Sequence, residues 1–232
     1  MFRNELSTGK NKFVDVSRAA GIFQSDLGFG LGIMVADVNN DGWEDVYITN
    51  DFYEDDYYYV NNGDGSFSEK GKSTFNHYST YSMGIDIADI NNDAQLDVIT
   101  LDMLPEDEAV LKTQDISRPY YMYKNVNEKL GYHPQNVKNC LHINNGNGTS
   151  FSEIALQSQV AATDWSWAPL FADFDNDGNK DLMVSSGIYK STNDLDFIHY
   201  TPKLHAKKQD SVDFNLYLTS QLPFIPSHPY LF

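Results

Sequence analysis

The sequence predicts an all-β fold made of repeated four-stranded antiparallel sheets. Three observations support this prediction: an Asp-rich segment occurs three times, β-prone residues flank each copy, and two Asn-Gly turns recur at matching places. β-branched and aromatic residues favour strands, and Asn-Gly turns join neighbouring antiparallel strands. Because 41% of the 232 residues are hydrophobic, the chain is able to form a packed core.

The Asp-rich segments occupy residues 37–45, 89–97 and 173–181, which we call loops one, two and three. A short apolar run containing small residues precedes each loop, and a β-rich run follows it, so each loop is expected to join two strands. Residues 59–69 and 142–153 share a further pattern of two β-prone runs around an Asn-Gly turn. These runs supply a third and a fourth strand to each unit.

Short four-stranded sheets repeated at this spacing are typical of the blades of a β-propeller. We expect one partial propeller over residues 1–232, with blades at about 13–62, 66–145 and 151–232. Residues 2–4 and 13–15 resemble a third and a fourth strand, and residues 230–232 resemble a third strand. Because a closed ring needs roughly four to eight blades, the remaining blades of a longer protein are an expected partner.

Extra residues at about 105–135 and 189–226 interrupt the second and third units between their second and third strands. We expect these insertions to be irregular or helical. Since each Asp-rich loop joins strands one and two, the insertions should lie at the opposite end of the blades. Their aromatic residues either form a binding surface or pack on the propeller. They are Tyr120, Tyr121, Tyr123, Tyr132, Phe197, Tyr200 and Phe214.

The loops carry the pattern of oxygen ligands that calcium prefers. Side chains at positions one, three, five and nine of each loop converge on one point, and position seven offers its backbone carbonyl. Without a cation, carboxylates packed this closely would repel one another. We therefore predict about three Ca²⁺ ions, one in each blade. The predicted ligands are Asp37, Asn39, Asp41, Trp43 and Asp45, then Asp89, Asn91, Asp93, Gln95 and Asp97, and finally Asp173, Asp175, Asp177, Asn179 and Asp181.

Two alternatives to these calcium loops are less consistent with the sequence. The helical calcium loop needs a Glu at position twelve, where this chain has Ile48, Thr100 and Val184, and it needs flanking helices. An Asp-rich turn without metal would explain a single copy better than three copies in register. Loop three has four Asp residues, and Ala94 replaces Gly at position six of loop two. We therefore expect calcium affinity to fall from loop three to loop one to loop two.

Composition excludes several kinds of partner. The formal net charge of −17 disfavours nucleic acids and anionic membranes. No apolar run approaches the roughly 18 residues of a membrane span, so direct membrane insertion is not expected. The lone Cys140 forms no internal disulfide and is expected to be a small buried residue.

The loop motif followed by the Asn-Asn-Gly turn resembles the FG-GAP or VCBS repeat of integrin α-subunit propellers and bacterial surface proteins. Residues 101–107 and 162–169 resemble exported VCBS-repeat proteins related to the cartilage acidic protein family, which often carry an ASPIC/UnbV domain. The resemblance implies a seven-bladed propeller with calcium in the loops between strands one and two. It also implies an exported protein that is extracellular, at the cell surface or periplasmic.

The favoured function is a calcium-stabilised scaffold or adhesion module that binds a protein or a carbohydrate through the face bearing the insertions. One alternative is a propeller hydrolase or lyase with its site in the central channel, and another is an accessory subunit of an outer-membrane uptake complex. The six His residues are scattered and no Gly-X-Ser-X-Gly motif is present, which favours a protein that is not an enzyme. Asp164, Trp165 and Trp167 are candidates for stacking against a sugar.

Overall fold

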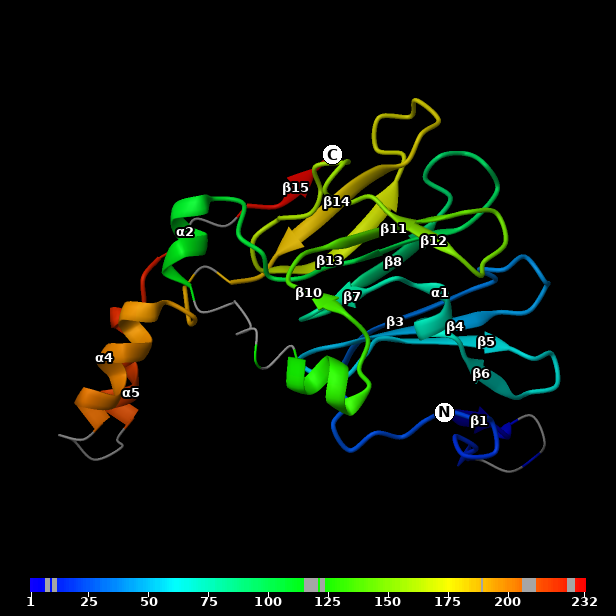
Figure 1. Ribbon diagram of the computed structural model, residues 1–232, viewed down its shortest axis with the longest axis horizontal. Coiled ribbons are helices and arrows are strands. Elements are labelled where there is room, and N and C mark those ends of the chain that lie inside the picture. The colour runs from blue at the N-terminus through cyan, green and yellow to red at the C-terminus, as the bar shows by residue number, and fades with distance from the viewer. Residues whose placement is uncertain are drawn as a thin grey trace.

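The computed structural model describes residues 1–6, 9, 12–114, 121, 124–188, 190–205, 212–224 and 228–232. The molecule is mostly β, and its strands form several antiparallel sheets that follow one another along the chain (Figure 1). This confirms the predicted mainly β class. The described residues form no closed barrel or ring.

The first sheet contains four antiparallel strands in chain order. These are β3 (Gly30–Ala36), β4 (Asp45–Asn50), β5 (Tyr57–Asn61) and β6 (Phe67–Glu69). Loop one joins β3 to β4, and the Asn-Gly turn joins β5 to β6, as predicted. The short helix α1 (Gly71–Thr74) follows β6.

The second sheet repeats this order with β8 (Ile85–Ala88), β9 (Asp97–Thr100), β11 (Cys140–Asn144) and β12 (Phe151–Glu153). Both four-stranded sheets are offset by one strand from the expected blade limits, because each fourth strand pairs with the strand before its Asn-Gly turn. The sequence pattern did not predict β7 (Tyr78–Ser79) and β10 (Gln135–Asn136), which form a short parallel pair.

The third sheet has three strands among the described residues, not the expected four. They are β13 (Ser166–Ala172), β14 (Asp181–Ser186) and β15 (Tyr230–Leu231). The expected unit at 151–232 also included residues 151–153, but these form β12, which pairs with β11 in the second sheet. At the other end of the chain, β1 (Phe2–Asn4) and β2 (Phe13–Asp15) pair as an antiparallel hairpin.

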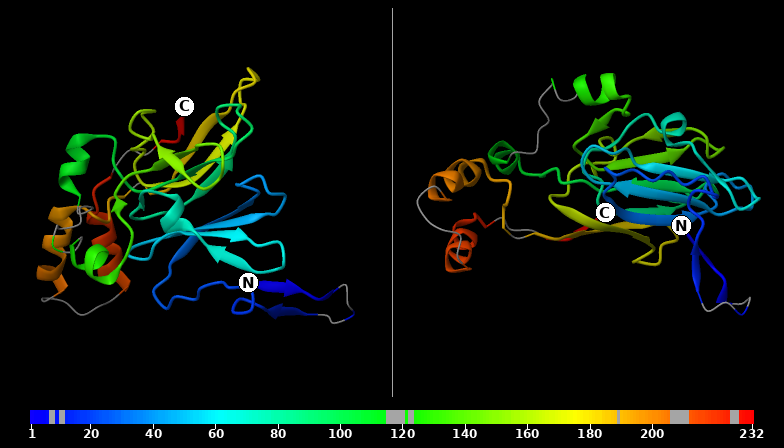
Figure 2. Two further views of the ribbon diagram at one scale, coloured as in Figure 1. Left: turned by 45° about the vertical axis from the view of Figure 1, so that its right-hand side comes forward. Right: turned by 90° about the horizontal axis from the view of Figure 1, so that it is seen from below.

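Helical segments occupy both expected insertions. The first contains α2 (Glu108–Thr113) and the π-helical segment η2 (Lys124–Glu128), and the second contains α4 (Leu195–His205) and α5 (Val212–Gln221). Figures 1 and 2 show α2, α4 and α5 at the end of the sheets opposite the Asp-rich loops, as predicted. No helix among the described residues is long and apolar enough to cross a bilayer.

The aromatic residues of the insertions have mixed environments. Phe214 is buried, whereas Tyr121 and Tyr200 are exposed. Tyr120 and Tyr123 lie outside the described residues. The insertions therefore contain both buried and exposed aromatic rings.

Alternate side chains of β9 contribute to two different hydrophobic cores, each of which lies between neighbouring sheets. Val98 belongs to an apolar cluster shared with the first sheet, and Ile99 belongs to a second cluster shared with the third sheet. Successive side chains of a strand point to opposite faces, so this central strand contributes to both interfaces. Cys140 is fully buried, as predicted, and burial raises the pKa of its thiol to about 12.

Gly32 and Gly84, in or beside the first strands of the first two sheets, are explained by the close approach of the next sheet. A Cβ atom at Gly32 would lie 3.1 Å from the Met83 carbonyl oxygen, and one at Gly84 would lie 2.1 Å from the Trp167 carbonyl oxygen. The Thr49 hydroxyl of β4 also donates a hydrogen bond to the Met83 carbonyl at 3.0 Å. The first strands therefore converge, and this fixes the relative position of the three loops.

Candidate metal centres

Loop one is held in a tight turn by its own acidic side chains. Both carboxylate oxygens of Asp37 accept backbone N–H groups, from Asp41 at 2.9 Å and from Gly42 at 2.8 Å. The side-chain oxygen of Asn39 accepts the same Asp41 N–H at 3.0 Å, and Asp41 accepts the Trp43 N–H at 2.9 Å. These bonds gather the oxygens of positions one, three and five on one side of the turn.

Loops two and three repeat these hydrogen bonds. The N–H of Asp93 donates to Asp89 and Asn91, both at 3.1 Å. In loop three, the N–H of Asp177 donates to Asp173 at 3.0 Å and to Asp175 at 3.1 Å. Three copies with the same bonds show that the repeated sequence produces a repeated structure.

Left-handed backbone at two positions closes each turn. Position four is Asn in all three loops, with φ of 57°, 58° and 61° at Asn40, Asn92 and Asn176. Position six also has positive φ, at Gly42 and Gly178, where Gly has no Cβ to clash, and at Ala94 with φ of 65°. The sequence therefore identified the strained position in loop two correctly.

The position-nine carboxylates lie at the base of their loops. Asp45 is buried and accepts the Asn61 N–H at 2.9 Å and the Tyr58 hydroxyl at 3.0 Å. Asp97 is buried and accepts the Asn144 N–H at 2.8 Å, and Asp181 accepts the Phe174 N–H at 2.9 Å. Each of these residues anchors its loop to the sheet or to the loop's own start.

Burial raises the pKa of Asp45 and Asp97. The hydrogen bonds that each carboxylate accepts lower its pKa, but by less than burial raises it. Repulsion from Asp41 raises the pKa of Asp45 further, and repulsion from Asp93 and Asp89 does the same at Asp97. A nearby cation would relieve both effects, because an opposite charge favours the ionised carboxylate.

Loop three has the donor set best suited to a hard cation. Carboxylate oxygens of Asp173, Asp175 and Asp177 all lie within 4.8 Å of one another, and this is the one such group of acidic, His or Cys side chains among the described residues. Asp181 is not part of the group. The site is open to solvent, and its all-oxygen donors match the ligand preference of Ca²⁺. The residues therefore fit a calcium ion.

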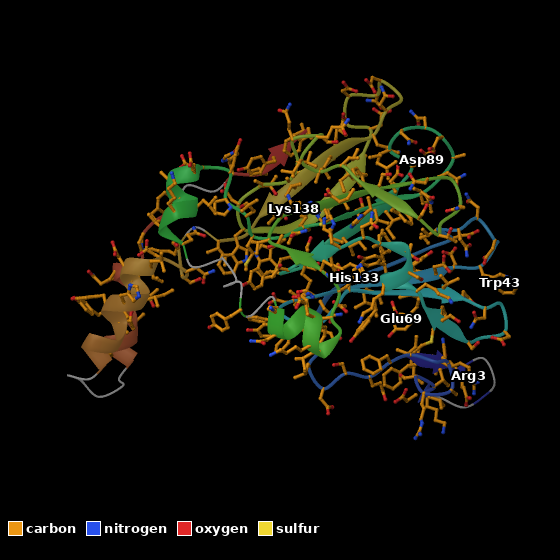
Figure 3. The ribbon with its side chains drawn as sticks, in the orientation of Figure 1. Arg3, Trp43, Glu69, Asp89, His133 and Lys138 are labelled. Carbon is orange, nitrogen blue, oxygen red and sulfur yellow. The ribbon has the colours of Figure 1, made fainter. Side chains whose placement is uncertain are left out.

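The three loops lie next to one another at one end of the sheets. Figure 3 shows Trp43 of loop one and Asp89 of loop two at this end, remote from the helices of the second insertion. Trp43 has an exposed ring. Its indole offers no acceptor, so the predicted contribution of position seven in loop one is the backbone carbonyl. The corresponding residues in the other loops are Gln95 and Asn179.

Sequence reasoning missed a contact between neighbouring loops. The amide of Asn40 donates to the Ala94 carbonyl at 3.2 Å and to the Gln95 side chain at 3.1 Å. The amide of Asn92 makes the equivalent bonds to Gly178 and Asn179, both at 3.3 Å. The signal was the invariable Asn at position four of the three copies, which no ligand role explained.

Comparison with protein families matches the FG-GAP-like repeat to residues 6–100 and 132–184. The matched segments omit most of the first insertion and end before the second. A comparison with curated proteins finds no match. The matched segments cover more than half of the sequence and contain all three loops, so the chain belongs to the FG-GAP-like repeat family.

Proposed function

We propose that this chain is a calcium-binding β-propeller module of an exported or cell-surface protein, with a binding role and not an enzymatic one. The observation that carries the proposal is the threefold repetition of one loop structure, with oxygen donors at positions one, three and five held by the same backbone hydrogen bonds. Membership of the FG-GAP-like repeat family supports an integrin-like, β-propeller type of module.

Calcium in these loops would support the structure. Extracellular calcium modules have dissociation constants of about 0.1 to 1 mM. At about 1 mM calcium, each occupied site would add roughly 0.4 to 1.5 kcal/mol to the free energy of unfolding. The ion would relieve the repulsion among clustered carboxylates and hold each loop closed between its two strands.

Apolar faces at both ends of the stack of sheets support further blades. On the third sheet, Leu170, Met183 and Leu231 are direct cross-strand neighbours and are 51%, 39% and 66% exposed. On the first sheet, Ile33 and Val35 are 64% and 53% exposed. Exposed apolar patches of this kind mark packing surfaces. We propose that remaining blades of a longer protein cover these faces.

Calcium titration of single-loop variants tests the metal assignment. Asp41→Asn, Asp93→Asn and Asp177→Asn each remove one charge while keeping the side-chain shape and an oxygen that accepts the turn hydrogen bond. We expect three sites by isothermal titration calorimetry. Asp177→Asn should remove the tightest site and Asp93→Asn the weakest. Equal affinities at the three sites would contradict the order, and the absence of any calcium-dependent heat would contradict the calcium role.

A further inference from the structure

A cavity of about 410 Å³ lies between the first sheet and the first insertion. Its walls come from the segment before β3, the connection between β4 and β5, the end of β6, helix α1, and Tyr132 of the insertion. This volume lies between the about 300 and 1,000 Å³ that are typical of small-ligand sites. None of the described lining residues belongs to an Asp-rich loop, so the loop motif does not account for the cavity.

Carboxylates outnumber basic groups in the cavity wall. Lys72 is the one basic residue among the described lining residues, and its ammonium pairs with Asp55 at 3.0 Å. The other carboxylates have no basic partner within the described part of the chain; the Glu54 carboxylate, for example, accepts the Ser25 hydroxyl at 2.6 Å. The four acidic residues of the wall are Glu54, Asp55, Asp56 and Glu69.

The wall therefore keeps an excess of negative charge at neutral pH. Asp56 is only partly ionised there, because burial raises its pKa to about 7. Three further carboxylates against one ammonium still leave a negative potential, which attracts cations and repels anions. A neutral ligand would leave this charge without a partner.

The carboxylates of the cavity are too widely spread for a metal ion. Among the described residues, the Asp group of loop three is the one set of three acidic, His or Cys side chains whose ligand atoms lie within 4.8 Å of one another. No three carboxylates of the cavity wall approach one another in this way. Ca²⁺ needs at least six oxygens around one point. Separated carboxylates suit an organic cation that carries more than one charge.

Lys72 shows how this wall holds an ammonium group. Its Nζ atom lies 3.0 Å from the Asp55 carboxylate, donates to the Gly131 carbonyl at 2.7 Å and lies 5.9 Å from the centroid of the Tyr132 ring. A carboxylate, a carbonyl and the face of an aromatic ring all attract an ammonium group. The Lys72 side chain is 50% exposed, so its ammonium is held at the rim and does not fill the cavity.

Aromatic side chains give the cavity an apolar part. Phe23 is 59% exposed, and its ring makes an edge contact with the Tyr57 ring at a centroid distance of 6.0 Å. Burial raises the pKa of Tyr132, and the charges of Glu54 and Asp55 raise it further. Aromatic rings next to carboxylates suit a ligand in which methylene groups separate the positive charges.

We propose that this cavity binds a linear aliphatic polyamine, whose ammonium groups pair with Glu54 and Glu69 and whose methylene chain packs on Phe23 and Tyr57. The two carboxylates belong to different elements, because Glu54 lies between β4 and β5 and Glu69 ends β6. A ligand with separated charges is able to contact both. This proposal rests on the binding role given under Proposed function and names the class of ligand.

Three variants test the cavity, and a fourth is the control. Glu54→Gln and Glu69→Gln each remove one charge and keep an oxygen that accepts the present hydrogen bonds. Lys72→Met removes the competing ammonium and keeps a long apolar side chain. Glu108→Gln is the matched control, because it removes the same charge from an exposed position of α2 that does not line the cavity.

The experiment titrates each protein with spermidine by calorimetry, at physiological ionic strength and in excess calcium, which keeps the polyamine away from the Asp-rich loops. We expect wild type and Glu108→Gln to bind one spermidine equally. Glu54→Gln and Glu69→Gln should bind it about tenfold more weakly, because each loses a charge-assisted hydrogen bond. Lys72→Met should bind it several-fold more tightly, because a like charge is removed.

Three results would overturn the proposal. One is the absence of spermidine binding by wild type. Another is equal weakening by Glu108→Gln and the two cavity variants, which would indicate general attraction to an acidic chain. The third is binding of Nα-acetyl-lysine methylamide as tightly as spermidine, which would indicate a single ammonium group from a protein side chain.

A calcium titration of wild type without polyamine separates this proposal from the calcium role. If calcium binds and spermidine does not, the cavity assignment alone is wrong. If spermidine binds with the expected dependence on Glu54, Glu69 and Lys72 while calcium does not bind, the calcium role alone is wrong.

Discussion

At the scale of single residues, Ala94 shows how one substitution weakens a repeated loop. Its φ of 65° lies in the region that L-residues avoid, at a cost of roughly 1 to 2 kcal/mol. Gly would remove that strain but would lose more chain entropy on folding, by about 0.5 to 1 kcal/mol. We therefore predict that Ala94→Gly raises the free energy of unfolding by about 0.5 to 1 kcal/mol, measured by urea denaturation.

Gly178→Ala is the reverse test at the equivalent position of loop three. A Cβ atom there meets nothing within 4 Å, so its effect is confined to the backbone, where φ is 92°. We expect a loss of about 1 kcal/mol or more. A destabilising Ala94→Gly together with a neutral Gly178→Ala would show that left-handed strain does not distinguish the loops.

His142 is a second residue whose environment conflicts with its chemistry. It is fully buried beside Phe75, and neither ring nitrogen has a hydrogen-bond partner within the described residues. Burial is the largest cause that lowers its pKa, to about 3 from the usual 6.5. Because the folded-state pKa is depressed, stability is fully present above about pH 6.5 and is lost as the pH falls toward 3.

His142→Leu removes both unpaired nitrogens at similar size. We predict that it raises the free energy of unfolding by about 1 kcal/mol at neutral pH, and that its advantage over wild type grows at about pH 5. Urea denaturation at the two pH values measures both effects. His199→Leu, at an exposed position of α4, should change neither value. A pH-independent difference between His142→Leu and wild type would contradict this account.

At the scale of elements, the position-four Asn residues join the three Asp-rich loops into a row. Asn92 bonds to loop three, whereas Asn176 makes no such bond within the described part of the chain. Both have left-handed backbone, so Gly at either position keeps the conformation and removes the amide. Asn176→Gly is therefore a matched control for Asn92→Gly.

We predict that Asn92→Gly lowers the free energy of unfolding by about 0.5 to 1.5 kcal/mol more than Asn176→Gly does. The difference reports the bonds between loops, because both variants share the entropic cost of glycine. Chemical denaturation in calcium measures it. Equal losses in the two variants would mean that the contacts between loops contribute nothing to stability.

The sequence predicted the elements whose signals are local. The strands around each loop and the turns after β5 and β11 follow from residues adjacent in the chain, and so does the strain at Ala94. The pairing of β7 with β10 and the amide contacts of Asn40 were not predicted, because each joins segments more than 50 residues apart. A periodic pattern in the sequence does not indicate which distant segments will contact each other in the fold.

At the scale of the whole molecule, the two ends of the sheets differ in how much of their structure the sequence predicts. The position and turn structure of the loop end follow from a repeated local motif, whereas the metal ligands assigned there stay a prediction. The position of the insertions at the other end followed from topology alone. A cavity of about 220 Å³ lined by Phe52, Tyr81 and Trp165 was not predicted, because its walls come from three sheets and one insertion.

Bound calcium is expected to stabilise the whole chain. If each of three sites adds roughly 0.4 to 1.5 kcal/mol at about 1 mM calcium, their removal costs about 1 to 4 kcal/mol. For a chain of this size, each kcal/mol shifts the melting temperature by about 2 to 4 °C. Chelation with EDTA should therefore lower the melting temperature by several degrees, as measured by circular dichroism or calorimetry.

The matched control is a triple variant, Asp41→Asn, Asp93→Asn and Asp177→Asn, which keeps loop shape and removes one charge from each site. Its melting temperature should respond much less to EDTA than that of wild type. In EDTA the variant should melt at or above wild type, because fewer carboxylates repel one another in the empty loops. A melting temperature of wild type that EDTA leaves unchanged would contradict structural calcium. An equal EDTA response in the triple variant would place the stabilising ion outside the three loops.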